Sequence, residues 1–238
     1  MTSLTLDTHL GAVDALEVGP RSRQVDLVLC IQGKSPNTDV VTEWHPLARL
    51  LQDKSIRVVV PNLHSNERTR PGTISQEDFD RFVLGALTQL KVKTLLCLCG
   101  KSWGGGRCVA FLAEHPSAAT SLMLIAPSLK ETTAGMVSDV AQKRTLLAWA
   151  WDDTVVPIAA AQPLLDSATA ELQAVLSRFE PYRGTESFNG FTGNLIRVAE
   201  RAATSPVPQR ADSPHGSAVE DVRNLNGFTI TAIWSISM

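Results

Sequence analysis

Hydrophobic and polar positions follow two different periods along this chain. Short, nearly continuous apolar runs bounded by polar or glycine-rich segments predict strands that are buried on both faces. Between these runs, apolar residues recur at helical spacing and predict amphipathic helices. Strands that alternate with helices predict an α/β fold, with a mostly parallel, twisted sheet and helices on both of its faces. The predicted strands are 25–31, 56–60, 94–99, 121–125, 145–151 and 172–179, and the predicted helices are about 38–51, 76–90, 103–114 and 158–168.

Both ends of the chain depart from this pattern. Near the N-terminus, Leu4 and Leu6 and then Leu16 and Val18 alternate with other residues around a short turn, which predicts an antiparallel hairpin at a sheet edge. After the last predicted strand the pattern becomes irregular, and we expect residues 180–213 to form an insertion or an irregular loop. We therefore expect a single domain over residues 1–238 with an irregular C-terminal region.

Composition narrows the classes of protein. The 238 residues, 44% hydrophobic and 19% charged, suffice for one sizeable core. A net charge of −2 without a basic stripe argues against a nucleic-acid partner. No segment resembles a signal peptide or has the apolar length of a membrane span, so we expect a cytoplasmic protein. The four cysteines favour packed free thiols, and no histidine or cysteine spacing predicts a metal site.

A serine framed by glycines carries the strongest chemical signal. Ser102 lies between Gly100 and Gly104, directly after a predicted strand and directly before a predicted helix. Strand, Gly-x-Ser-x-Gly and helix together are typical of a nucleophile elbow, in which the chain turns so sharply that only glycine fits beside the serine. The helix N-terminus would place backbone donors and partial positive charge beside the hydroxyl. The alternative interpretation is a structural turn with a capping serine.

With this motif the chain resembles the α/β-hydrolase superfamily, and in particular its small, lidless serine hydrolases. The resemblance implies no cofactor, and it assigns the backbone N–H groups of Trp103 and Lys34 to an oxyanion hole. Gly33 and Ser35, in the loop after the first central strand, would then contact the substrate. Gln32 stands where the superfamily usually has histidine, but the donor in question is a backbone group, so the exchange need not remove it. Alternatively, this segment is an ordinary strand-to-helix loop.

The acid and the base follow from the same resemblance. Asp153 comes after the predicted strand 145–151 and four residues before a proline, where the superfamily often places its acid; the alternative is a turn with a helix cap. Asn189 occupies the segment where relatives present the base, and asparagine cannot transfer a proton near neutral pH. His215 is therefore the candidate base, because Ser102, Asp153 and His215 keep the superfamily's order of nucleophile, acid and base; otherwise it is an exposed turn residue.

Two functions from different classes remain open. One is a serine hydrolase that cleaves a carboxylic ester, a thioester or a similar small acyl substrate through an acyl-enzyme. The other is a catalytically inactive protein with the hydrolase fold that binds a ligand or a protein partner. Gln32 and Asn189, at positions where relatives carry histidine, favour the second function.

Overall fold

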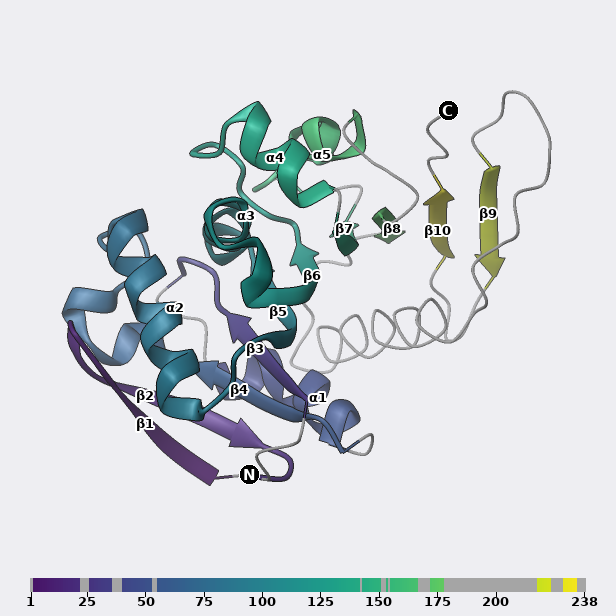
Figure 1. Cartoon of the computed structure of the whole chain (residues 1–238). Coiled ribbons are helices and arrows are strands. Elements are labelled where there is room, and N and C mark those ends of the chain that lie inside the picture. Colours follow the sequence, from purple (N-terminus) through teal and green to yellow (C-terminus); the bar gives the residue numbers. More distant parts are fainter. Residues whose placement is uncertain are drawn as a thin grey trace.

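The strands of the computed structural model lie in one sheet of ten (Figure 1). The model describes residues 2–21, 26–35, 40–52, 55–141, 143–150, 153, 155–166, 172–177, 218–223 and 229–234. Along the sheet the order is β1-β2-β4-β3-β5-β6-β7-β8-β10-β9. The strands are β1 (Thr2–Thr8), β2 (Gly11–Val18), β3 (Leu27–Ile31), β4 (Arg57–Pro61), β5 (Leu95–Lys101), β6 (Ala119–Ile125), β7 (Arg144–Ala150), β8 (Leu172–Ser177), β9 (Ala218–Arg223) and β10 (Thr229–Trp234).

The central part of the sheet is parallel, as the alternating pattern predicts. Strands β4, β3, β5, β6, β7 and β8 pair in parallel, and antiparallel strands flank them at both sides. Because the carboxyl ends of parallel strands meet at one edge, the loops that follow β3, β5 and β7 share that edge of the sheet. The candidate loops of the sequence analysis are these three.

Helices cover both faces of the sheet, which confirms the predicted α/β class. Alternate residues of β3 enter two different apolar clusters: Leu29 packs with α2 and α3, whereas Cys30 packs with α1. In α2, the Ser75 hydroxyl accepts the Asp78 N–H as an N-cap. The helices are α1 (Val40–Gln52), α2 (Gln76–Leu90), α3 (Trp103–Glu114), α4 (Ala134–Ala141) and α5 (Gln162–Asp166).

The predicted N-terminal hairpin is confirmed as β1 and β2. A side chain of helix α2 lies along the outer edge of β1: the Gln89 amide accepts the Asp7 N–H at 2.9 Å and donates to the Thr5 carbonyl at 3.0 Å. On β2, Glu17 is 1% exposed, and its carboxylate is paired with Arg21 at 2.5 Å and Arg57 at 2.6 Å. A buried carboxylate is tolerated only with such partners, and the ion pair with Arg57 joins the hairpin to β4.

The C-terminal region adds two strands to the sheet among its described residues. β10 pairs antiparallel with β8, and β9 pairs antiparallel with β10. The predicted insertion at 180–213 and the candidate base His215 lie outside the described residues. Within the part of the chain that the structure describes, no helix has the length and apolar character to cross a membrane.

Candidate active site

Ser102 occupies the single residue between strand β5 and helix α3. Its backbone has φ +50° and ψ −117°, a combination that residues other than glycine rarely adopt and that costs about 1–3 kcal/mol. Three hydrogen bonds hold this backbone: the Ser102 N–H donates to Ile125 at 2.9 Å, and the Ser102 carbonyl accepts from Gly106 at 3.2 Å and Ser128 at 2.8 Å. Ser102 is the N-cap residue of α3, but its hydroxyl makes no capping hydrogen bond.

The glycines around Ser102 are required by close backbone contacts. A Cβ atom on Gly104 would lie 2.4 Å from the Gln32 carbonyl oxygen, and one on Gly106 would lie 2.1 Å from the Ser128 carbonyl oxygen. Both distances are far inside van der Waals contact, and the obstructing atoms belong to the backbone. Glycine at these positions lets the first turn of α3 pack directly against the end of β3 and against the loop after β6.

The loop after β3 lies beside the serine. A Cβ atom on Gly33 would be 3.5 Å from the Ser102 Cβ, so the backbone of this loop passes in direct contact with the elbow. Trp103 is the first residue of α3, and the N–H groups in the first turn of a helix have no acceptor within that helix. Lys34 is exposed, and its side chain lies against Gly72. The first turn of α3 and the Gly33 loop therefore both lie beside Ser102.

Gln32 is buried without compensation at the start of this loop. The residue is 0% exposed, and neither its amide nitrogen nor its amide oxygen has a hydrogen-bond partner among the described residues. Burial of an unpaired polar group typically costs about 1–3 kcal/mol. Gln32, which stands where the superfamily usually has histidine, therefore makes no side-chain hydrogen bond to any described residue.

An ion pair fixes the end of β5 next to the serine. Lys101 Nζ contacts Glu43 Oε1 of helix α1, and the Glu43 side chain is 3% exposed. Helix α1 covers the opposite face of the sheet from α3. The ion pair therefore links Lys101, the residue before Ser102, to the helix on that opposite face.

His64 lies close to the same loop, in the turn after β4. Both imidazole nitrogens are buried without a hydrogen-bond partner among the described residues. Burial, and secondarily the charge of Arg70, lowers the pKa of His64 below its ordinary value, while the Ser35 backbone opposes the shift. The folded protein therefore binds a proton at this site less readily than the unfolded chain does.

We expect this imidazole to make the fold acid-sensitive. The stability linked to a neutral His64 is fully present above the unfolded pKa of about 6.5, and it is lost as the pH falls from there toward the lower folded pKa. Urea unfolding at pH 8.0 and pH 5.5 should give a smaller free energy of unfolding at pH 5.5, and His64→Gln should narrow that difference. An equal difference in the variant would show that another group carries the acid sensitivity.

Asp153 follows β7 and organises its own loop. Its Oδ1 atom accepts the N–H groups of Val155 at 2.8 Å and Val156 at 2.9 Å, and the Val156 carbonyl in turn accepts the indole N–H of Trp149 at 2.8 Å. The turn-forming role left open in the sequence analysis is thus observed. Since His215 is not among the described residues, the catalytic role of Asp153 stays a prediction.

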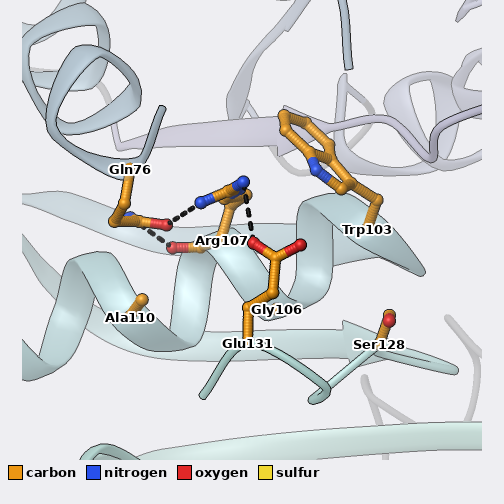
Figure 2. Close-up of a pocket in the computed structure, with 7 residues that line it drawn as sticks. All are labelled: Gln76, Trp103, Gly106, Arg107, Ala110, Ser128 and Glu131. Carbon is orange, nitrogen blue, oxygen red and sulfur yellow. Dashed lines mark hydrogen bonds and ion pairs between the residues drawn. The ribbon is translucent and has the colours of Figure 1, made fainter. Parts of the chain in front are cut away.

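The structure adds a polar pocket that the sequence analysis missed. Arg107, in the second turn of α3, reaches Gln76 of α2 and Glu131 of the loop after β6, and Trp103 lies beside it (Figure 2). A possible signal was present, because Arg107 interrupts a run of glycine and apolar residues on the helix of the elbow. Among the described residues, no group of three or more histidine, cysteine or acidic side chains could hold a metal ion.

Comparisons with known proteins identify the family and the fold. A family model described as alpha/beta hydrolase fold matches residues 26–152. No curated protein sequence matches the chain significantly.

Several solved structures share the fold at low sequence identity. A predicted CIB-like hydrolase from Thermoplasma acidophilum is 17% identical, with a TM-score of 0.66 over 83% of this chain and 98% of that one. An α/β serine hydrolase without a lid from Xanthomonas campestris is 22% identical, with a TM-score of 0.58 over 83% and 94%. The thioesterase domain from the curacin biosynthetic pathway is 15% identical, with a TM-score of 0.64 over 86% and 99%.

Proposed function

Because the chain belongs to the alpha/beta hydrolase fold family, we propose that it is a serine hydrolase that cleaves a carboxylic ester, a thioester or a similar small acyl substrate. The observation that carries this proposal is the backbone of Ser102. A strained conformation persists only where the surrounding structure enforces it, and such strain is concentrated at functional sites. In this strained conformation the Ser102 hydroxyl makes no capping hydrogen bond, and Ser102 lies next to the Gly33 loop.

The proposed reaction begins at the Ser102 hydroxyl. Ser102 Oγ attacks the acyl carbonyl carbon while His215 takes the hydroxyl proton, and the carbonyl oxygen becomes an oxyanion. The N–H groups of Trp103 and Lys34 would donate to that oxyanion, with Gly33 and Ser35 beside the bound substrate. His215 then protonates the leaving alcohol or thiol, and a water molecule hydrolyses the acyl-enzyme by the reverse proton path. No cofactor takes part in these steps.

Asp153 would orient the imidazole and stabilise its cation. Asp153 could have this role in addition to its role in the turn. The two backbone N–H groups of the turn donate to Oδ1, and the second carboxylate oxygen can accept an imidazole N–H. Asp153→Asn is therefore the informative substitution, since an asparagine can keep the two backbone hydrogen bonds while it loses the charge. The lidless hydrolase and the thioesterase domain among the similar structures are compatible with this class of reaction.

A second candidate function rests on Gln32. A buried glutamine without a hydrogen bond to any described residue stands at the position where the superfamily usually has histidine, and Asn189 stands where relatives present the base. Both departures favour a protein that keeps the hydrolase fold but binds a ligand or a protein partner without turning it over. The two functions differ in whether Ser102 is nucleophilic.

A fluorophosphonate probe separates the two functions. We expect the 238-residue chain to be labelled covalently, with mass spectrometry locating the adduct on the peptide that contains Ser102. An activated serine reacts because a neighbouring base removes its proton, whereas an ordinary surface serine does not. Absence of labelling in protein that unfolds cooperatively would favour the inactive binding protein. Pretreatment with phenylmethylsulfonyl fluoride should block the label and serves as the control.

A further inference from the structure

The pocket around Arg107 lies next to the backbone of Ser102. Trp103, which follows the serine, forms one wall, and Ser128, whose N–H donates to the Ser102 carbonyl at 2.8 Å, forms another. Gln76 and Glu131 complete its polar lining (Figure 2). The elbow and this pocket thus share the first two turns of α3 and the loop after β6.

Arg107 is held in place by groups that are themselves fixed. Its side chain is 13% exposed, Nη1 donates to Gln76 Oε1 at 3.0 Å, and Nη2 lies 3.4 Å from the Ile74 carbonyl oxygen. The guanidinium carbon lies 5.3 Å from the centre of the Trp103 ring, within the range of a cation–π contact. Because none of these contacts involves Glu131, the guanidinium would keep its position if that residue moved away.

Glu131 is the exposed partner of this arginine. Its side chain is 70% exposed, and its Oε2 lies 2.9 Å from Arg107 Nη2. An ion pair with such an exposed partner is typically worth less than about 1 kcal/mol, so another carboxylate can compete with it. The Arg107 guanidinium is therefore held in position, whereas the Glu131 carboxylate that pairs with it can be replaced by another carboxylate.

The surrounding charge favours a single carboxylate. Gln76 Nε2 donates to Asp80 Oδ1 at 2.7 Å, so a second acidic group lies behind Gln76. Burial raises the pKa of Asp80, and the charge of Arg107 acts in the opposite direction. Asp80 partly offsets the arginine, which disfavours a dianion such as phosphate. A planar carboxylate also matches the fork of a guanidinium.

We propose that this pocket binds the carboxylate of an anionic acyl substrate, with Glu131 as the resident group that the substrate displaces. The substrate class is then a half-ester or half-thioester of a dicarboxylic acid, in which Ser102 attacks one acyl carbon and Arg107 receives the free carboxylate at the other end. This inference rests on the proposed function for its catalytic part, whereas carboxylate binding at Arg107 stands by itself.

Binding tests the inference without any turnover. Glutarate is titrated into the 238-residue chain while tryptophan fluorescence is followed, since Trp103 contacts the guanidinium of Arg107. We expect saturable binding that Arg107→Met weakens by about tenfold or more, and that Glu131→Gln strengthens several-fold by removing the competing charge. Arg81→Met, an exposed arginine on α2, is the matched control and should leave the affinity unchanged.

Turnover tests the substrate class. We expect the wild-type protein to have a higher kcat/KM for the mono-p-nitrophenyl ester of glutaric acid than for p-nitrophenyl acetate. Arg107→Met should lower the ratio of these two kcat/KM values by about tenfold or more. Glu131→Gln, at a largely exposed residue, should fold normally and raise the ratio. An unchanged glutarate affinity in Glu131→Gln and Arg107→Met would overturn the inference. Glutarate binding without hydrolysis of either ester would instead overturn the proposed function.

Discussion

Ser102→Ala should lower kcat/KM for p-nitrophenyl acetate by about a thousandfold or more. The substitution removes the oxygen that forms the acyl-enzyme in the proposed mechanism, and the remaining rate would come from the oxyanion donors and from binding alone. The strained backbone at residue 102 costs about the same for alanine as for serine, so the free energy of unfolding should change little. The rate of p-nitrophenolate release and the urea unfolding curve measure the two quantities.

Two comparisons make this result specific. Ser128→Ala removes a hydroxyl from the adjacent pocket but leaves its backbone hydrogen bond to Ser102 intact, and it should retain most of the activity. His215→Ala should lose about as much activity as Ser102→Ala, because residues that act as one unit have non-additive effects. Activity that survives in both Ser102→Ala and His215→Ala would contradict the assignment of these residues and would identify the hydrolysis as background.

Gly104→Ala should destabilise the fold by about 2–4 kcal/mol. Its Cβ would lie 2.4 Å from the Gln32 carbonyl oxygen and 2.7 Å from the Ile31 carbonyl oxygen, both in the backbone at the end of the central strand β3. Overpacking against a rigid backbone forces the helix and the strand apart, and a displacement here also moves the Gly33 loop away from Ser102. The free energy of unfolding from urea denaturation gives the magnitude.

A second glycine provides the matched control. Gly85 lies within α2, and a Cβ atom there would meet no other atom within 4 Å. Gly85→Ala should therefore stabilise the protein by about 0.5–1 kcal/mol, because alanine has the higher helix propensity. If both alanine variants were equally stable, the close approach of α3 to β3 would not be a determinant of the fold.

The parts of the fold that follow from local sequence were predictable. Continuous apolar runs identified the central strands, and Gly100 and Gly104 around Ser102 identified the elbow, because a sharp turn restricts residue type at adjacent positions. The pocket at Arg107 was not predicted, since its partners Gln76 and Glu131 belong to segments that only tertiary packing brings together. The same reason applies to the ion pair between Glu43 and Lys101.

The base of the candidate site illustrates a different limit. A nucleophile elbow is defined by adjacent residues, but the partner of the serine is defined by contact across the fold and not by spacing. By the resemblance to the superfamily, Asn189 takes the position where relatives present the base, whereas His215 matches only the expected order of the three residues along the chain.

The amide of Gln89 has a consequence for the behaviour of the protein in concentrated solution. Outermost strands of open sheets offer unpaired N–H and C=O groups on which a neighbouring molecule can build, and fibrous aggregation often starts there. In this chain, Gln89 already occupies the Asp7 donor and the Thr5 acceptor on that rim. These two groups of β1 are therefore not available to a strand of another molecule, which disfavours edge-to-edge aggregation along β1.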